Sequence, residues 1–341
     1  MKQKKVTFAD IAAYTGFSKT TISRYFNNPD SLTLENQEKI AHALDVLGYQ
    51  ENKLAKVLAN GKSEFVGIII PNLYLHYYSE MLNQLLSTYE KYNYKFLVFI
   101  GNNKKEIEEK YIHELMAYKI EGLIVLSNTI SSEELASYKL PVVTIERECD
   151  HVCSVSTDNY LGGVQATSLL IRNKCDVILH INSIFPDTLP TYGRIRGFED
   201  ICNEHHVVHE LIQRNLGNTY QETLTQLKNI FNEIEEKYPS QKKGVFLAND
   251  TYASMFLNLI FQKYGELPKD YQIVGFDDSP IASEAILPIT TVGQQIEKIA
   301  QTAMELLVLQ MNEMKKRKPT PLKEPVHKQI TPVLIRRDTT E

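Results

Sequence analysis

The sequence predicts an α/β protein in which a small helical unit precedes a large body of two similar α/β lobes. Residues 1–50 carry helix-capping and helix-breaking residues at short intervals. From Glu64 onward, short apolar runs such as FVGIIIP alternate with amphipathic segments, which is typical of buried parallel strands joined by helices. The alternation starts again after Asp158, so we expect two sheets with right-handed crossovers.

Composition supports a folded protein and argues against a membrane segment. The chain has 341 residues, of which 43% are hydrophobic and 23% are charged. This is typical of a globular chain of two or three domains. No apolar run approaches the roughly 18 residues of a membrane helix, and the basic start MKQKK leads into polar helical sequence. We therefore expect a cytoplasmic protein without a membrane partner.

The four cysteines predict no metal site. Cys149, Cys153, Cys175 and Cys202 form no C-x-x-C pair. Cys149 and Cys153 flank His151, but we expect a strand and its adjoining turn there. Reduced structural thiols are typical of a cytosolic protein.

Charge is unevenly distributed along the chain. Residues 1–62 hold nine Lys and Arg against six Asp and Glu, a balance of +3, whereas the remaining residues hold 28 against 36, a balance of −8. A small basic unit on an acidic body indicates that the small unit is the part that meets phosphate.

The first 50 residues predict three short helices. Thr7 and Asp10 have the spacing of a capping box, Gly16 breaks the first helix, and Ser18 begins a second helix of about residues 19–27. A third helix, near 34–47, is predicted to bury Ile40, Ala41, Leu44 and Leu47.

The spacing of Ala12, Gly16 and Ile22 indicates a helix-turn-helix. Two tightly crossing helices need a small residue at the contact, a turn residue that tolerates positive φ, and an apolar anchor on the second helix. A plain helical hairpin is the alternative. The polar residues on the second helix favour the helix-turn-helix.

A long helix beginning near Gln295 ends in the basic run KKRK at 315–318. We interpret this run as the solvated end of the helix. A nucleic-acid-binding patch is the alternative.

The segment VTFADIAAYTGFSKTTISRYFNN resembles the N-terminal signature of the LacI/GalR family. ALDVLGYQENKLAKVLANGKSEFVGIIIP is similar to the third helix, hinge and first core strand of that family. STDNYLGG, GRIRGF, FLAND, VGFDDSP, LPITTVGQ and IRRDTT match further family segments in order. The resemblance therefore covers nearly the whole chain.

The resemblance implies a domain organisation. Residues 1–50 would be the helix-turn-helix DNA-binding domain and 51–61 a hinge helix. Residues 62–341 would be a periplasmic-binding-protein-like α/β domain for effector binding and dimerisation. Its lobes would comprise 62–160 with 293–325, and 161–292 with 326–341.

The resemblance also implies a sequence-specific transcription regulator, most simply a repressor, that binds near-palindromic operator DNA as a homodimer. Base contacts are expected from Lys19, Thr20 and Arg24. Phosphate contacts are expected from Thr7, Thr21, Ser23 and Asn27. For Ser23 and Asn27, a solvated helix face is the alternative.

The hinge is too short for a stable free helix. By the resemblance, two hinge helices pair in the minor groove, where Leu58 wedges between base steps and Ala55 permits helix–helix contact. An ordinary amphipathic linker is the alternative.

The resemblance places a small-molecule effector, expected to be a sugar, in the cleft between the lobes. Aromatic faces for it are expected from Tyr74, Tyr77 and Tyr78. Polar contacts are expected from Arg147, Asp158, Arg194, Asn249, Asp277 and Gln294. We interpret Asn159 and Asp278 as helix caps. A nucleobase or a protein corepressor is the alternative effector.

Two other classes of protein are less compatible with the sequence. A sugar-binding transport protein would share the lobes but would not need residues 1–61. No P-loop, G-x-S-x-G, H-E-x-x-H or G-x-G-x-x-G motif is present, so we expect no catalytic residues and no cofactor. The sequence lacks a heptad tail for tetramer formation.

Overall fold

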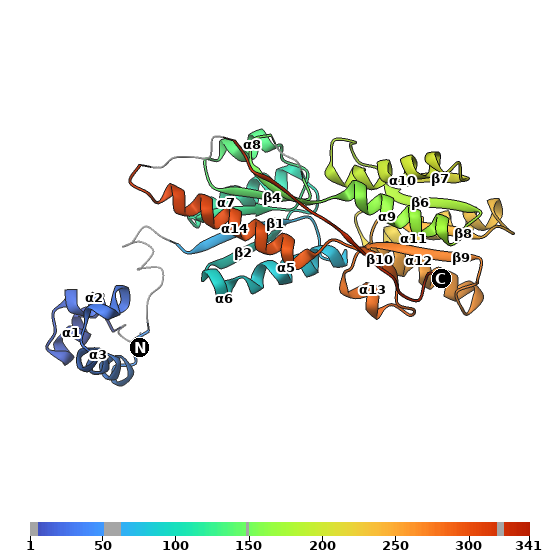
Figure 1. The fold of residues 1–341 in the computed structure, drawn as a ribbon. Helices are drawn as coiled ribbons and strands as arrows, with labels where there is room; N and C mark the ends of the chain where they lie inside the picture. The colour runs from blue at the N-terminus through green and yellow to red at the C-terminus, as the bar shows by residue number, and fades with distance from the viewer. Residues whose placement is uncertain (1–5, 51–62, 148–149, 319–323) are drawn as a thin grey trace. The chain divides into compact units, whose positions relative to one another are not determined.

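The computed structural model describes residues 6–50, 63–147, 150–318 and 324–341. The chain divides into two compact units, Met1–Lys62 and Ser63–Glu341 (Figure 1). The predicted hinge residues Ala55 and Leu58 lie outside the described residues.

The small unit consists of three helices whose ends follow from local sequence. They are α1 (Phe8–Thr15), α2 (Lys19–Asn27) and α3 (Leu34–Val46), with a short 3-10 turn η1 (Pro29–Ser31). Before α1, the Thr7 backbone N–H donates to Asp10 Oδ2 at 2.8 Å. Gly16 ends α1 with a φ of 75°, where a side chain would be strained. Ser18 Oγ accepts from the Thr21 N–H at the start of α2.

In the core of the small unit, Ala43 is buried where the sequence predicts Ala41. Ile11, Ile22 and Ile40 are fully buried, as is Ala43, whereas Ala41 is exposed. Ala43 stands three residues after Ile40 and so shares its face of α3, while Ala41 follows Ile40 directly and points elsewhere.

The first lobe of the large unit contains a six-stranded sheet in the order β11-β5-β4-β3-β1-β2. All its strand pairs are parallel. The strands are β1 (Phe65–Ile70), β2 (Lys95–Ile100), β3 (Gly122–Val125), β4 (Val142–Ile145), β5 (Cys153–Thr157) and β11 (His327–Ile330). Helices α5 (His76–Ser87) and α14 (Ile296–Met314) cover one face, and α7 (Lys105–Ala117) and α8 (Ser132–Ser137) cover the other (Figure 1). The short α6 (Tyr89–Tyr92) follows α5.

The second lobe contains a six-stranded sheet in the order β12-β10-β9-β8-β6-β7, in which only the pairing of β12 with β10 is antiparallel. The strands are β6 (Val177–Ser183), β7 (His209–Arg214), β8 (Lys243–Leu247), β9 (Tyr271–Asp277), β10 (Thr290–Gly293) and β12 (Val333–Ile335). Helices α9 (Asn159–Arg172) and α10 (Gly193–Glu204) cover one face, and α11 (Tyr220–Lys237) and α12 (Asp250–Tyr264) the other. The 3-10 turn η2 (Pro190–Tyr192) and the short α13 (Pro280–Glu284) complete the lobe. The predicted fold class is confirmed.

The chain passes between the lobes three times, after β5, after β10 and after β11. The last passage differs from the predicted boundary, which placed 326–341 in the second lobe. β11 instead pairs with β5 in the first sheet, with His327 beside Ser154. The chain thereby covers the edge of β5 and satisfies backbone groups that would otherwise be unpaired. Only β12 and the residues after it join the second lobe.

Two glycines bring α9 and α10 into close contact. A Cβ on Gly163 would lie 2.4 Å from the Arg194 carbonyl oxygen, and one on Gly197 would lie 2.4 Å from the Tyr160 carbonyl oxygen. Backbone atoms cannot move aside as a flexible side chain can, so both positions require glycine. This contact sets the distance between Asn159, which opens α9, and Arg194 on α10.

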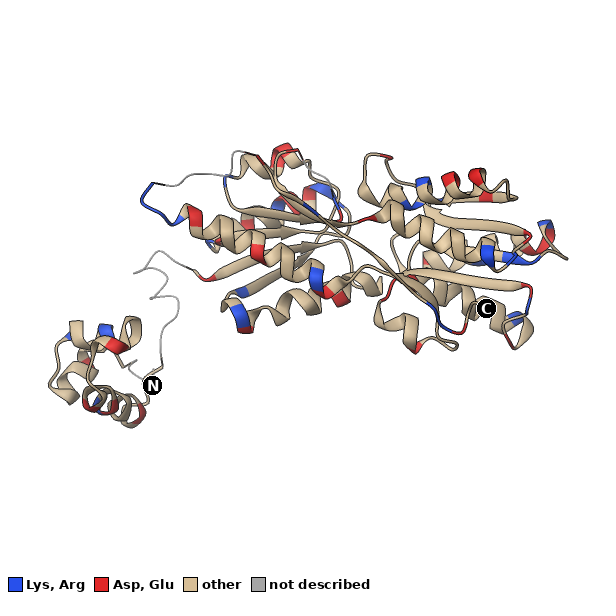
Figure 2. Ribbon diagram, viewed as in Figure 1, with Lys and Arg blue, Asp and Glu red and all other residues tan. Residues whose placement is uncertain are grey.

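Acidic and basic side chains are both spread over the large unit, and the loop after α14 is a continuous basic stretch (Figure 2). None of the described helices combines the length and the apolar character that a membrane crossing requires.

Candidate ligand site and nucleic-acid interface

The second helix of the small unit presents the predicted base-contacting residues to solvent. Lys19, Thr20 and Arg24 are exposed on α2, while Ile22 on the same helix is buried in the core. The helix therefore has a buried anchor and a free polar face, which is what a helix that enters a DNA groove requires.

The predicted phosphate contacts are tied to neighbouring polar groups. Thr7 Oγ1 donates to Asp10 Oδ2 at 2.6 Å, and Thr21 Oγ1 lies 2.9 Å from the hydroxyl oxygen of the cap Ser18. Asn27 Nδ2 donates to the Ser23 carbonyl oxygen at 3.0 Å. A hydroxyl has further donor and acceptor capacity, so these bonds do not prevent a phosphate contact.

In the large unit, Arg194 is the centre of a buried polar cluster. Its Nε donates to Asn159 Oδ1 at 2.8 Å and its Nη1 donates to the Ala248 carbonyl oxygen at 2.5 Å. The guanidinium carbon lies 3.6 Å from the centroid of the Phe276 ring. Hydrogen bonds and stacking together fix the orientation of the guanidinium.

The cluster continues from Arg194 into the first lobe. Asn159 Nδ2 donates to Glu146 Oε2 at 2.9 Å, and Glu146 Oε1 accepts from the Thr157 N–H at 2.7 Å. Glu146 is buried and directly follows β4, so a carboxylate of the first lobe reaches a guanidinium of the second through one amide.

Sequence reasoning assigned two of these positions differently. The predicted cap Asn159 is not the N-cap of α9. That cap is Asp158, whose Oδ1 accepts from the Leu161 N–H at 3.0 Å. Glu146 was missed. An acidic residue directly after the apolar strand 142–145 was the available indication, since such residues lie at the carboxyl edge of the sheet.

Asp277 joins the cluster from the end of β9. Its Oδ1 accepts from Gln294 Nε2, and Gln294 Oε1 accepts from Thr157 Oγ1 at 2.6 Å. Asp277 is only 2% exposed. Burial raises the pKa of Asp277 well above its ordinary value, and the positive charge of Arg194 opposes that increase. The structure therefore brings together the predicted Arg194, Asp277 and Gln294.

Two of the predicted tyrosines face the same charges. The Tyr77 and Tyr78 ring centroids lie 5.3 Å apart. Burial raises the pKa of both phenols, Glu146 and Asp277 raise it further, and Arg194 opposes the increase. The Tyr77 hydroxyl is buried and has no hydrogen-bond partner among the described residues. A buried hydroxyl without a partner lowers the stability of the fold by about 1–3 kcal/mol. The Tyr77 hydroxyl is therefore available to a polar ligand atom or a water molecule.

Three other residues that the sequence predicts as effector contacts interact with further protein groups. Arg147 donates to the carbonyl oxygens of Ser127 and Ile130 and so holds the loop after β3. Asn249 Oδ1 accepts from the Tyr252 N–H at 2.8 Å and is the N-cap of α12. Tyr74 interacts with the buried phenol of Tyr252, whose pKa burial raises to about 12.

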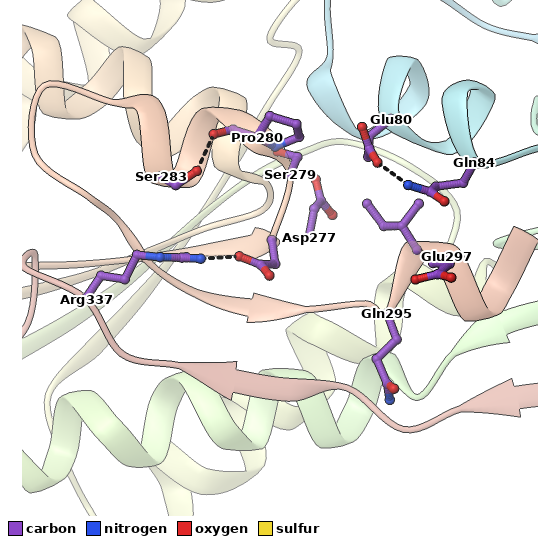
Figure 3. Close-up of a pocket in the computed structure, with 11 residues that line it drawn as sticks. Glu80, Gln84, Asp277, Ser279, Pro280, Ser283, Gln295, Glu297 and Arg337 are labelled. Carbon is purple, nitrogen blue, oxygen red and sulfur yellow. Dashed lines mark hydrogen bonds and ion pairs between the residues drawn. The ribbon is translucent and has the colours of Figure 1, made fainter. Parts of the chain in front are cut away.

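A polar cavity of about 290 Å³ adjoins the cluster, and Asp277 forms part of its wall (Figure 3). Residues of α5, α13 and the start of α14 also line it, as does Arg337. Asp278 also lines it, and its Oδ1 pairs with Arg337 Nη2 at 2.6 Å. Asp278 is therefore not the predicted cap, since Ser279 is the N-cap of α13.

Leu75 and His76 contact the second lobe from the start of α5. The His76 N–H, at the start of α5, donates to Thr251 Oγ1 at 3.0 Å, and His76 Nδ1 lies 3.0 Å from the same oxygen. The adjacent Leu75 packs against the core of the second lobe. Movement of one lobe relative to the other would have to break these contacts.

Asp250 should make the stability of the large unit depend on pH. It is fully buried at the start of α12, accepting from Thr291 Oγ1 at 2.6 Å and from the Ser279 N–H at 2.9 Å. Burial raises its pKa to about 7, although these donors oppose the increase. The folded carboxyl therefore keeps a proton that the unfolded chain releases near pH 4, at about its ordinary pKa.

The contribution of Asp250 to the free energy of unfolding should be fully present below about pH 4. It should be lost as the pH rises toward about 7. Urea unfolding of the wild type and of Asp250→Asn over this range measures the effect. The variant stays neutral, so the wild type should lose stability relative to it as pH rises. Parallel curves for the two proteins would contradict a raised pKa.

Comparison with known proteins agrees with both units. A family model of bacterial regulatory proteins of the lacI family matches residues 7–52. A model of the periplasmic binding protein-like domain matches residues 168–340.

Relatives of known function match nearly the whole chain. The sucrose operon repressor of Streptococcus mutans is 26% identical over 303 residues, covering 88% of this chain and 91% of that protein. The ribose operon repressor of Bacillus subtilis is 26% identical over 305 residues, covering 89% and 90%. The fold is similar to a Lac repressor dimer bound to operator and the anti-inducer ONPF, with a TM-score of 0.81, 20% identity and 99% coverage of each chain.

A helix-turn-helix unit joined to a two-lobed body with a polar cleft defines a ligand-responsive DNA-binding regulator. The chain belongs to the LacI family of bacterial regulatory proteins.

Proposed function

We propose that this protein is a cytoplasmic transcriptional repressor that binds a near-palindromic operator as a homodimer and is controlled by a neutral sugar. The observation that carries the effector proposal is the buried cluster of Glu146, Arg194 and Asp277 beside the unpaired hydroxyl of Tyr77. Sugar hydroxyls both donate and accept hydrogen bonds, so they can pair with carboxyl, guanidinium and phenol groups together.

On the DNA side, Lys19, Thr20 and Arg24 would read bases, with Arg24 forming a bidentate contact to guanine. The proposed phosphate contacts are Thr7, Thr21, Ser23 and Asn27. The roles of Ala55 and Leu58 in the minor groove remain predictions from the sequence. The exposure of Lys19, Thr20 and Arg24 on α2 supports the proposed base contacts.

The charges of the cluster favour a neutral effector over a phosphorylated one. Two acidic side chains, Glu146 and Asp277, surround the single guanidinium of Arg194, which already donates to two protein oxygens. A phosphate would meet these carboxyl groups and only one cation. The sucrose operon repressor and the ribose operon repressor are named for neutral sugars, which is consistent with this proposal.

Control of DNA binding would follow from linkage between the two sites. The cluster contains groups from both lobes, so a bound sugar would favour one lobe arrangement over another. It can shift the equilibrium only by its differential affinity for the two states. The contacts of Leu75 and His76 with the second lobe are expected to differ between those states.

Thermal unfolding against a panel of mono- and disaccharides, sugar phosphates and purines tests the effector. A neutral sugar should raise the transition temperature, with about 2.7 kcal/mol of stabilisation at 100-fold excess over Kd. The same sugar should change the affinity for a duplex that the protein selects from a random-sequence pool. Stabilisation by sugar phosphates or purines alone would contradict a neutral effector. No stabilisation by any compound would favour a protein corepressor.

A further inference from the structure

The basic run at the end of α14 lies at one defined edge of the first sheet. Lys315 Nζ pairs with Glu121 Oε2 at 2.6 Å and lies 2.9 Å from the Tyr94 hydroxyl. Tyr94 directly precedes β2 and Glu121 directly precedes β3. Because these strands are parallel, the residues ahead of them share the amino edge of the sheet. Figure 2 shows the basic stretch at the end of α14.

The chain enters the large unit at this same edge. Ser63 and Glu64 precede β1. Ser63 Oγ donates to the Lys119 carbonyl oxygen at 2.5 Å, and the Glu64 N–H donates to Glu121 Oε1 at 2.8 Å. The residues 51–62 that join this edge to the small unit can span at most about 40 Å. A linker of this length allows a duplex bound by the small unit to approach this edge.

Four cations of this edge are available to a partner, and we call them the basic edge: Lys119, Lys139, Arg317 and Lys318. All four are exposed. Among the described residues no carboxylate forms an ion pair with any of them, whereas Lys315 and Lys316 pair with Glu121 and Glu313. Among the described residues, Glu64 at this edge pairs with Lys95 at 2.8 Å. Asp150 and Glu324 lie ahead of β5 and β11, and Glu90 and Glu114 lie in α6 and α7, which end on this side of the sheet.

The positive charge of this surface contrasts with the net negative charge of the large unit as a whole. Residues 63–341 hold 28 Lys and Arg against 36 Asp and Glu. Lysines near a helix end are favoured by the helix dipole, and this explains Lys315 at the cap of α14. The dipole effect is confined to the last turn, so it does not account for Arg317 and Lys318 beyond it.

We propose that the basic edge is a second DNA-contacting surface, which binds backbone phosphates in the duplex that flanks the operator. The proposal rests on the proposed function, because the small unit must first bring DNA to this edge. Exposed lysine and arginine side chains suit phosphate contacts that add affinity without reading sequence. The contribution should therefore depend on salt and on the length of the duplex.

Operator binding by the full-length Arg317→Gln/Lys318→Gln variant tests the proposal. The probes are a duplex that the wild type selects from a random-sequence pool, made with long flanks or trimmed to the selected site. Lys228→Gln/Lys269→Gln is the matched control, because both lysines are exposed on the second lobe and the net-charge change is the same. The binding constant is measured over a series of salt concentrations.

With long flanks, the plot of log K against log salt should become less steep by about 3.6 for the basic-edge variant, because the proposed dimer loses four phosphate contacts at about 0.9 each. The control variant should keep the wild-type slope, and on the trimmed duplex all three proteins should agree. If the basic-edge variant has the same salt slope as the control variant on long flanks, the proposal is overturned. The same result is expected if this surface binds an acidic protein instead of DNA. If the wild type selects no duplex, the proposed function itself fails, and this proposal fails with it.

Discussion

Replacement of Arg194 by alanine is expected to abolish the effector response and to destabilise the large unit by about 3 kcal/mol. The guanidinium donates to Asn159 and to the Ala248 carbonyl oxygen and stacks on Phe276. Its loss leaves a buried carbonyl and a buried amide oxygen unpaired. It also removes the positive charge that opposes the high pKa of Asp277.

Urea unfolding measures the loss of stability, and operator affinity with and without the sugar identified in the panel measures the response. Arg194→Lys keeps a positive charge but lacks the fork of donors, so it should fold and still fail to respond. Arg196→Ala is the matched control, because Arg196 lies on the same helix but is exposed. A normal sugar response in Arg194→Lys would place the effector elsewhere.

Replacement of Arg24 by alanine is expected to weaken binding to the selected duplex by about 1–3 kcal/mol in each half-site, the cost of losing one bidentate base contact there. Arg24 is exposed, so the small unit should keep its stability within about 0.5 kcal/mol. The prediction is checked by titrating the duplex and by thermal unfolding of the same variant.

Arg24→Lys separates base reading from charge. Lysine can still approach a phosphate or a single acceptor, so this variant should keep the salt dependence of the wild type but lose discrimination against altered base pairs. Lys39→Ala, which removes an exposed cation from α3, is the control for lost charge. If Arg24→Ala binds both selected and altered duplexes like this control, Arg24 does not read a base.

Sequence reasoning worked best where the structure depends on neighbours in the chain. The caps at Thr7 and Ser18 and the positive φ at Gly16 are local, because each group interacts within about four residues. The continuous apolar strands can also be predicted from the sequence, because a strand that helices cover on both faces needs apolar residues throughout.

The candidate site was predicted only in part. Arg194, Asp277 and Gln294 follow from their motifs, and the structure brings them together. The predicted cap Asn159 instead bonds Arg194 and Glu146, and the preceding Asp158 is the N-cap of α9. Adjacent residues at a helix start differ mainly in orientation, so the sequence does not separate their roles. The close contact of α9 with α10 decides which of the two faces Arg194.

The sequence by itself determined the order of helices and strands, the polar face of α2 and the family to which the chain belongs. Tertiary structure alone decided that β11 joins the first sheet, that Glu146 reaches Arg194 through Asn159, and that the Tyr77 hydroxyl stays unpaired. The physical reason is distance along the chain. Strand pairing and burial of polar groups depend on residues far apart in sequence, whose positions are fixed only when the lobes pack.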